Sequence, residues 1–578
     1  MKKTLYIVSM ASLLTACYED KGNYDYTFDQ MNEITEVTFT PGTVETIDGK
    51  TIELQQPLSE AESTQRVEVA LEQTLASGLD NLDFSWVRTY TNEEGVQVKD
   101  TLYTKGYMEV YLPVGQSMRY DVLLEVKDRT TTLANYTKFV IKTRPIFKNS
   151  LFFLHGAQGA RKLGNIEVIG AETKVRTDAY QTVYPENANP FGDAISLCYN
   201  TYYDLSMNDM KQSNNLSIYT STGTASVYEP FGLSYKFNPY FVLPTNAEPF
   251  VYSKNVETGD PYNYSYYRCA LSKDGRFYIG NHIVKLYIPG EYMTSDPNHQ
   301  TDYRVEAATI TNNHFVLWDA KNNRFLYMNK QDGSMGTDEF SVLNYGQYMS
   351  SYMPVLDAHV DFSLLPPGVS PVGKKVVYAY IQYRENYEET HPFFIFKDEE
   401  TGKFYQYELT PLATDGKGDG KNSKDGENGT TGQPAFSISY REMVDFEPGD
   451  NLNLICYNSY FTTNYIFYAD GSDVYRYNIS NGDKTLLYSV AEGYTISVMK
   501  FRVNNACSNT GDLGYILTLG LNKGSEGAIA EIKLNTASDL DEEFTPLFYD
   551  QSSEGEKLGN IQEVQFAHEY MYQITTYN

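Results

Sequence analysis

The chain has 578 residues and a formal net charge of −29, and this balance excludes several classes of partner. Phosphate binding needs clustered Lys and Arg, so we expect neither nucleic-acid binding nor electrostatic adhesion to anionic lipid. Hydrophobic residues make up 41%, enough for a folded core, and the 52 tyrosines favour strands and extracellular recognition. The length predicts several domains, or one small domain followed by a large repeat architecture.

The first residues have the pattern of a secretory lipoprotein signal. Two lysines precede a short apolar stretch, which ends in Leu-Thr-Ala-Cys at 14–17 and is too short to span a bilayer. We therefore expect residues 1–16 to be a signal peptide and Cys17 to carry the lipid that contacts the membrane. Residues 17–33 are polar, with little periodicity, and are expected to form a lipidated tether.

Residues 34–145 alternate in the manner of short β-strands separated by turn signals, which predicts a β-sandwich. The clearest strand covers residues 120–128, where apolar side chains occupy every second position. Trp86 lies in the middle of another strand and is expected to fill the core between two sheets.

Residues 146–578 repeat one pattern, in which a polar turn leads into an alternating strand rich in aromatic residues. Phe277 and Phe325 occupy equivalent places in two such strands and are 48 residues apart, within the usual period of a propeller blade. The pattern predicts an all-β chain whose sandwich is followed by a β-propeller of about seven blades. A second set of sandwich domains remains the alternative. The turns are at residues 273–276, 321–324, 400–403 and 470–473.

A propeller avoids exposed strand edges by closing into a ring. The strand expected at 569–576 could pair with the strand that begins at Leu151 and so close it. Trp318 is expected in a blade core. The Gly/Asp-rich stretch at 413–433 predicts a disordered surface loop; it fails as a calcium loop because Lys417 and Gly426 stand where ligands are needed.

Motifs of catalysis and metal binding are missing from the sequence. It contains no H-E-x-x-H, no G-x-S-x-G, no P-loop and no dinucleotide fingerprint, and we expect no cofactor. Asp357, His359 and Asp361 alternate, so a strand would place them on one face, but nothing around them completes a site and no metal is expected. The cysteines after Cys17 form no C-x-x-C pair, which leaves free thiols or a disulfide; they are Cys198, Cys269, Cys456 and Cys507.

Tyrosines gather in two segments that resemble loops between strands, and they are the candidate ligand-binding residues. Aromatic faces stack on sugar rings or accept apolar peptide side chains, while the hydroxyls form hydrogen bonds at the rim. The alternative is that these rings wedge between blades. The five residues are Tyr262, Tyr264, Tyr345, Tyr348 and Tyr352.

The run Cys-Tyr-Glu-Asp-Lys-Gly-Asn-Tyr-Asp-Tyr at 17–26, followed by Asn-Glu-Ile at 32–34, resembles the start of the PKD-like family lipoproteins of the Bacteroidetes. Residues 84–86 and 120–128 likewise resemble a PKD-type immunoglobulin-like domain. Glu19 and Asp20, directly after the lipidated cysteine, resemble the export signal of surface lipoproteins.

The resemblance implies an outer-membrane lipoprotein that faces the cell exterior and captures a glycan or peptide. It also implies a Sus-like uptake system as the setting, with a TonB-dependent transporter and its lid lipoprotein as partners. No catalytic residues are transferred by it. We expect a non-catalytic accessory or binding subunit, and the alternative is a surface propeller hydrolase or lyase that acts on a polysaccharide or peptide.

Overall fold

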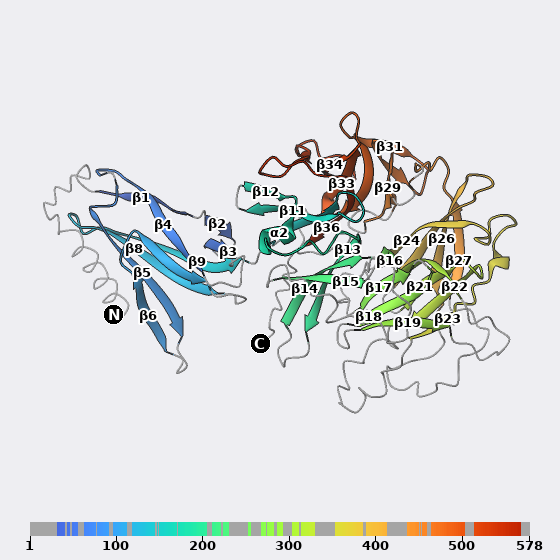
Figure 1. Ribbon diagram of the computed structural model, residues 1–578, viewed down its shortest axis with the longest axis horizontal. Coiled ribbons are helices and arrows are strands. Elements are labelled where there is room, and N and C mark those ends of the chain that lie inside the picture. The colour runs from blue at the N-terminus through green and yellow to red at the C-terminus, as the bar shows by residue number, and fades with distance from the viewer. Residues whose placement is uncertain are drawn as a thin grey trace, which may run out of the picture. The chain divides into compact units, whose positions relative to one another are not determined.

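The computed structural model of the chain folds into two compact units, Met1–Arg144 and Pro145–Asn578 (Figure 1). The described residues are 32–567 without 41–42, 47–48, 56–62, 77, 92–95, 113–117, 145–146, 148–149, 170–171, 205–210, 221–222, 230–251, 256–266, 273, 282–285, 293–302, 311–313, 330–352, 385–388, 413–435, 450, 452–453, 459–463 and 503–513. No helix in this described part is long and apolar enough to cross a membrane.

The first unit is a sandwich of two β-sheets. Neighbouring strands run antiparallel except for β3 and β9, which pair in parallel. One sheet has the order β1-β4-β7, formed by Ile34–Thr40, Ser63–Gln73 and Tyr107–Leu112. The other has the order β2-β3-β9-β8-β5-β6, formed by Thr43–Thr46, Gly49–Gln55, Ala134–Arg144, Arg119–Asp128, Leu82–Thr91 and Gln97–Tyr103.

A single hydrophobic cluster fills the sandwich, and both sheets contribute to it. The alternation in β8 buries Val122, Leu124 and Val126, because side chains two residues apart share one face of a strand. Trp86 is fully buried, as expected, and its indole N–H donates to the Lys105 carbonyl at 2.8 Å. Its ring meets Phe139 edge to face at 5.7 Å. The sequence pattern therefore predicted this core.

A polar cluster around Asp128 fixes the start of β1 to the end of β8. The carboxylate accepts hydrogen bonds from the side-chain amides of Asn32 and Asn81, each at 2.8 Å, and from the Thr131 N–H at 2.7 Å. The Thr131 N–H first, and then the Asn32 amide, hold the pKa of the Asp128 carboxyl well below its usual range. Asn32 lies two residues before β1, so this cluster ties the chain at the start of β1 to the end of β8.

The second unit is a β-propeller with seven blades in its described part, in agreement with the expected number. Blade 1 comprises β36 (Ile561–Ala567), β10 (Ser150–His155), β11 (Lys162–Ile169) and β12 (Glu172–Arg176). Blade 2 comprises β13 (Ala194–Asp204), β14 (Lys211–Thr220) and β15 (Gly223–Glu229). The short helix α2, Ala179–Val183, lies between them in the sequence.

Blades 3 and 4 share an eight-stranded sheet, because the last strand of each pairs in parallel with the other, β19 with β23. Blade 3 comprises β16 (Tyr252–Asn255), β17 (Tyr267–Ser272), β18 (Phe277–Asn281) and β19 (Leu286–Tyr292). Blade 4 comprises β20 (Val305–Ile310), β21 (His314–Asp319), β22 (Arg324–Asn329) and β23 (Met353–Asp357).

The last three blades are separate four-stranded sheets. Blade 5 comprises β24 (Lys375–Arg384), β25 (Glu389–Lys397), β26 (Phe404–Pro411) and β27 (Phe436–Glu442). Blade 6 comprises β28 (Ile455–Cys456), β29 (Tyr465–Asp470), β30 (Asp473–Asn478) and β31 (Lys484–Ser489). Blade 7 comprises β32 (Thr495–Phe501), β33 (Ile516–Lys523), β34 (Glu526–Lys533) and β35 (Leu547–Tyr549).

The hydrophobic core of the propeller lies between successive blades. Separate clusters join blades 1 and 2, 4 and 5, 5 and 6, 6 and 7, and 7 and 1. Trp318 is fully buried between blades 4 and 5, where it meets Phe396 edge to face at 4.9 Å. The expectation that it is a core residue is correct. Positive φ at Asn323, Gly402 and Gly471 likewise agrees with the predicted hairpin turns.

The ring closes between β36 and β10, which pair antiparallel and place Phe566 opposite Leu151. A C-terminal strand was expected to pair with this partner, but the closing strand is Ile561–Ala567. The strand predicted at 569–576 lies outside the described residues. Glu563 on β36 also forms an ion pair with Lys500 at 3.0 Å and accepts a hydrogen bond from Ser196 at 3.3 Å. Blades 7 and 2 therefore both contact the closing strand.

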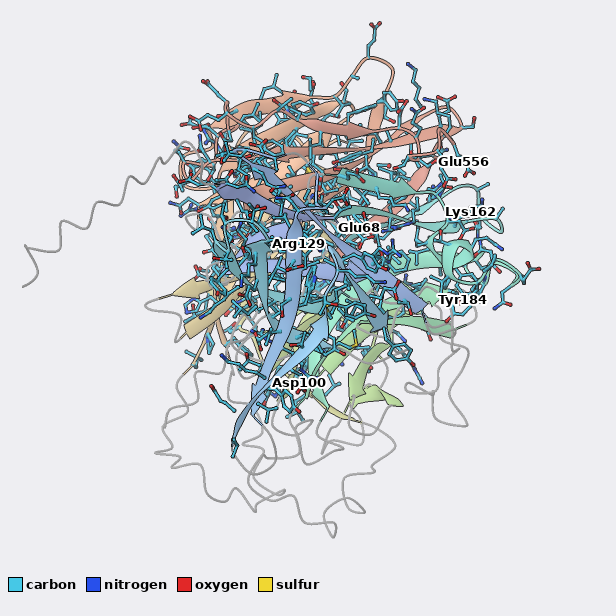
Figure 2. All side chains as sticks on the ribbon, turned by 90° about the vertical axis from the view of Figure 1, so that its left-hand side faces the viewer. Glu68, Asp100, Arg129, Lys162, Tyr184 and Glu556 are labelled. Carbon is cyan, nitrogen blue, oxygen red and sulfur yellow. The ribbon has the colours of Figure 1, made fainter. Side chains whose placement is uncertain are left out.

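A buried histidine supports the same closure. His155 Nδ1 accepts the Gly559 N–H at 3.0 Å, and its Nε2 lies 2.7 Å from the Thr177 carbonyl oxygen. Because an amide N–H only donates and a carbonyl only accepts, the imidazole is neutral and carries its proton on Nε2. Burial lowers the pKa of His155. Lys162 and Glu556 lie close by, 3.8 Å apart (Figure 2).

Candidate functional site

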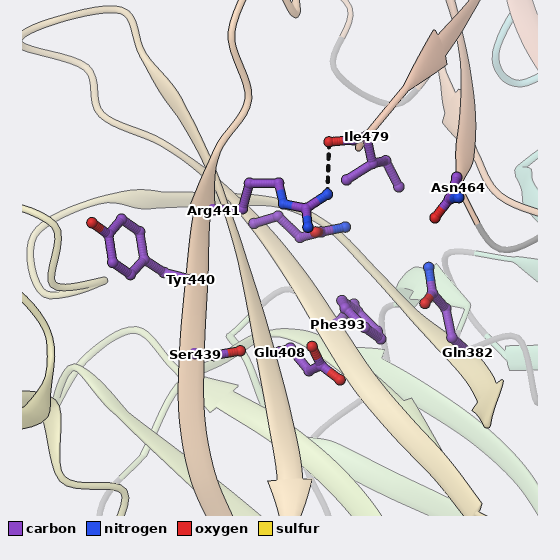
Figure 3. A pocket seen from close by; sticks show the side chains of 9 residues that line it. Gln382, Phe393, Glu408, Ser439, Tyr440, Arg441, Asn464 and Ile479 are labelled. Carbon is purple, nitrogen blue, oxygen red and sulfur yellow. Dashed lines mark hydrogen bonds between the residues drawn. The ribbon is translucent and has the colours of Figure 1, made fainter. Parts of the chain in front are cut away.

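A polar pocket of about 520 Å³, part of it open to solvent, lies between blades 5 and 6 (Figure 3). Its polar lining residues are Gln382, Gln406, Glu408, Ser439, Arg441 and Asn464. Phe393 and Ile479 supply apolar surface, and Tyr440 lines one edge. Four adjacent strands of blade 5 contribute. Among the described residues of blade 6, Asn464 and Ile479 contribute, at the two ends of its β29–β30 hairpin.

Strand register explains why these side chains meet. Glu408 lies opposite Phe393 on one side and opposite Ser439 on the other, while Gln406 lies opposite Arg441. Because alternate residues of a strand share one face, these side chains all point toward blade 6. Tyr440 lies between Ser439 and Arg441 in the sequence, and its ring points away from the pocket (Figure 3).

Phe393, which lines the pocket, belongs to an aromatic stack. The Tyr380 ring lies nearly parallel to Phe393, with centroids 5.2 Å apart, and 4.4 Å from the Tyr457 ring of blade 6. The Gln406 amide donates a hydrogen bond to the Tyr380 hydroxyl. Burial raises the pKa of Tyr380 well above its usual value, so this hydroxyl stays neutral. The stack therefore fixes the position of Gln406.

A histidine contacts the Glu408 carboxylate and orients it. His391 Nδ1 lies 2.7 Å from Glu408 Oε1, and the imidazole side chain is 11% exposed while the carboxylate side chain is 24% exposed. The second ring nitrogen of His391, Nε2, is buried. Glu408 can therefore reach a ligand in the pocket, whereas the imidazole cannot.

Arg441 supplies the positive charge of the pocket and joins the two blades. Its Nη1 donates to the Ile479 carbonyl at 2.9 Å, shown as the dashed line in Figure 3, and the residue remains exposed. The pocket thus combines a carboxylate, a guanidinium, amides and a hydroxyl. Within the described residues, no group of three His, Cys, Asp or Glu side chains could hold a metal ion.

The predicted site residues fall outside the part of the chain that the structure describes. Cys17, the loop at 413–433 and all five candidate tyrosines, Tyr262, Tyr264, Tyr345, Tyr348 and Tyr352, lie outside the described residues. Cys456 is a buried thiol that is in no disulfide.

Asp357, His359 and Asp361 do not share a strand face. β23 ends at Asp357, which pairs with Arg324 at 3.3 Å, and His359 has a positive φ of 47°. Asp361 instead caps the short 3₁₀ helix Phe362–Leu364 by accepting the Ser363 N–H. The chain turns after Asp357, so a single strand carrying all three residues is not formed.

Sequence reasoning missed the pocket because no motif marks it. The available signal was weak: polar residues alternate at 406 and 408 and again at 439 and 441, within strands that also carry aromatic residues. Such an alternation is typical of a solvent-facing strand surface. Nothing in this alternation indicates that a second blade packs against the surface.

The architecture is that of a sandwich followed by a seven-bladed propeller, and the comparisons with known proteins agree with the first part of it. Residues 17–189 match the PKD-like family, so the resemblance seen at 17–26 is confirmed, and this part of the chain is PKD-like. No curated protein matches the chain.

Solved structures resemble the chain at low sequence identity. A quinoprotein alcohol dehydrogenase-like protein from Bacteroides thetaiotaomicron is 9% identical, with a TM-score of 0.34, over 89% of this chain and 96% of its own. A periplasmic gluconolactonase from Pseudomonas aeruginosa is 9% identical, with a TM-score of 0.36, over 72% and 99%. An auxiliary nutrient binding protein from Bacteroides thetaiotaomicron is 10% identical, with a TM-score of 0.28, over 87% and 95%. At these scores none of them bears on the activity of this chain.

Proposed function

We propose that the protein is an outer-membrane lipoprotein, anchored through Cys17 and facing the cell exterior, that serves as a non-catalytic binding subunit of a Sus-like, TonB-dependent uptake system. The lipoprotein signal at 1–17 and the acidic residues Glu19 and Asp20 support the location. The PKD-like match, which begins at the cysteine itself, supports the setting. The ligand is a glycan or a peptide.

The pocket between blades 5 and 6 is the observation that carries the binding role. Glu408 is oriented by His391, and the Nε2 atom of that imidazole is buried. A proton shuttle would need the second nitrogen within reach of substrate. The imidazole therefore orients the carboxylate, and this fixed acceptor supports a role in holding a ligand.

The tether is long enough for a surface role. Cys17 and Asn32 are 15 residues apart, and a fully extended chain of that length spans at most about 50 Å. The sandwich would then begin within that distance of the bilayer, beside the extracellular parts of a transporter.

The test is affinity purification of the full-length protein from membranes of cells that make it. We expect a TonB-dependent transporter and a second lipoprotein to co-purify, and surface-added protease to cleave the protein on intact cells. Cys17→Ser should abolish acylation and membrane retention, whereas Cys507→Ser, the matched removal of a thiol, should not. Purification without partners, combined with turnover of a polymer, would overturn the proposal.

A surface hydrolase or lyase is the second candidate. A carboxylate paired with an imidazole, in an open pocket that also holds Arg441, combines residue types that such enzymes use. On that reading Glu408→Gln abolishes turnover of a polysaccharide or peptide. Measurement of product release from a polymer library by the wild-type protein separates the two candidates directly.

A further inference from the structure

We infer that the pocket between blades 5 and 6 binds a neutral saccharide rather than a peptide. This inference rests on the proposed binding function and names its ligand class and its site. Three features of the pocket carry it: the mixture of donors and acceptors, the small apolar surface, and the fixed positions of the polar groups.

The mixture of polar groups fits hydroxyl-rich ligands. Each sugar hydroxyl can donate one hydrogen bond and accept two. Glu408 accepts, while Arg441 and the Asn464 amide donate, and the Ser439 hydroxyl does both. Glu408 lies opposite Ser439, so Arg441 is its diagonal neighbour on the adjacent strand. The Cα atoms of such neighbours are about 7–8 Å apart. One sugar ring with its hydroxyls can bridge that separation.

The apolar surface is too limited for a peptide side chain. Phe393 is only 3% exposed because its ring is stacked on Tyr380, and Ile479 is 6% exposed. Pockets that anchor peptides bury apolar side chains in apolar walls, with only a few polar groups for orientation. Here the proportions are reversed, since polar groups form most of the lining.

The polar groups are held before any ligand arrives. His391 orients Glu408, the Tyr380 hydroxyl holds Gln406, and the Ile479 carbonyl holds Arg441. Fixed side chains lose less conformational entropy on binding, which favours affinity for ligands that offer many weak hydrogen bonds. The net charge of −29 disfavours polyanionic glycans, which leaves neutral saccharides as the ligand class.

The experiment applies the full lipidated protein in detergent to an array of neutral plant, microbial and host oligosaccharides. The same protein is applied to polygalacturonate and to a casein peptide digest, and hits are measured by calorimetry. We expect at least one neutral oligosaccharide to bind, and Glu408→Gln to weaken it at least tenfold. Glu442→Gln makes the same chemical change on the opposite face of β27, where Glu442 pairs with Lys403, and should leave affinity unchanged.

A second variant guards against loss of structure around His391. Ser439 is exposed, so Ser439→Trp should fold normally and fill the pocket, and it should abolish the same binding. For Glu408→Gln, unchanged Trp318 fluorescence in a Trp86→Phe background verifies the fold. For Ser439→Trp, which adds a tryptophan of its own, an unchanged far-UV circular dichroism spectrum and thermal midpoint verify it. Retained saccharide affinity in both pocket variants would overturn the site.

The remaining outcomes distinguish this inference from the proposed function. Peptide or polygalacturonate binding that Glu408→Gln weakens would overturn the ligand class and leave the binding function standing. A wild-type protein that co-purifies with a transporter but binds nothing on the array would overturn the inference alone. If it neither co-purifies nor binds, both fail.

Discussion

The sandwich and the propeller distribute their hydrophobic cores in opposite ways. The sandwich places residues from both of its sheets in one cluster, with Trp86 among the fully buried side chains. The propeller divides its core into clusters between successive blades, and its ring depends on one pairing, β10 with β36. A defect in the sandwich core therefore affects the whole unit, whereas a defect in one blade interface is local unless it opens the ring.

The two units also differ in how deeply their arginine ion pairs lie. Glu531 and Glu167 are fully buried in the propeller, each paired with an arginine: Arg502 at 2.7 Å and Arg176 at 3.0 Å. Arginine ion pairs of the sandwich, such as Arg66 with Glu68, have side chains that are about half exposed. Removing one partner of a buried pair leaves an uncompensated charge, so these arginines constrain blades 1 and 7 strongly.

Trp86→Ala should have the largest effect. Truncation of a fully buried aromatic side chain typically costs about 3–5 kcal/mol, and Trp86 belongs to the cluster that both sheets of the sandwich share. Trp318 is then the only tryptophan left, so its fluorescence in a denaturant titration reports the propeller alone, while far-UV circular dichroism reports both units. We expect the sandwich to unfold at a lower denaturant concentration than in the wild type. The midpoint of the transition reported by Trp318 should not change. An equal shift of both would show that the cores are coupled.

Asp128→Ala should destabilise the sandwich by about 1–3 kcal/mol, because buried N–H groups lose their acceptor. The folded-state pKa of Asp128 is depressed, so its contribution is complete above the unfolded pKa, near 4, and is lost as pH falls through the folded-state pKa. In chemical denaturation, the difference in free energy of unfolding between wild type and variant should be constant from pH 8 to 5. It should decrease below pH 4. A difference in free energy of unfolding that increases on acidification would contradict this prediction.

His155 should give the propeller a pH dependence that the sandwich core lacks. Its pKa is lowered in the folded state, so stability is complete above about pH 6.5 and declines as pH falls toward the folded-state pKa. Between pH 6.5 and 5.5 the decline attributable to one histidine is at most about 1.4 kcal/mol. His155→Asn should remove this dependence of the unfolding free energy on pH, measured through Trp318 fluorescence. His359→Asn, at an exposed imidazole, should leave the dependence unchanged.

Arg66→Ala should have the smallest effect. Arg66 pairs with Glu68 at 3.5 Å and with Glu109 at 3.4 Å on the solvent face of the sandwich. Exposed pairs of this kind contribute little to stability, because water and salt screen the attraction between the two charges. Thermal unfolding in low and high salt should differ little between variant and wild type. A loss of stability as large as that of Asp128→Ala would contradict this, because it would show that the Arg66 side chain is not exposed to solvent.

Local patterns predicted the strands and turns well because they depend on neighbours in sequence. The alternation at 122, 124 and 126 and the turn glycines 402 and 471 follow from strand period and backbone sterics alone. The closing strand was predicted at 569–576, whereas the strand that pairs with β10 is 561–567, which carries polar residues among its apolar ones. Glu563 is polar because it meets Lys500 and Ser196 on neighbouring blades, a contact that sequence spacing does not reveal.

The pocket could not be predicted for a related reason. Glu408 and Arg441 come from adjacent strands, but Asn464 and Ile479 reach the site only because blade 6 packs on blade 5. The parallel pairing of β19 with β23 likewise joins segments of two blades that nothing local specifies. Contacts that depend on how whole blades pack together cannot be predicted from local residue patterns.

The hydrogen bond between Gly559 and His155 joins residues that are 404 positions apart, which has a consequence for biosynthesis. At typical translation rates, about 20–80 s separate the appearance of these two residues at the ribosome. Throughout that interval blade 1 lacks its first strand, and the edge of β10, with Leu151 and Phe153, has no pairing partner. An unpaired apolar edge is a site for aggregation. The nascent chain should therefore depend on chaperones until β36 has been made.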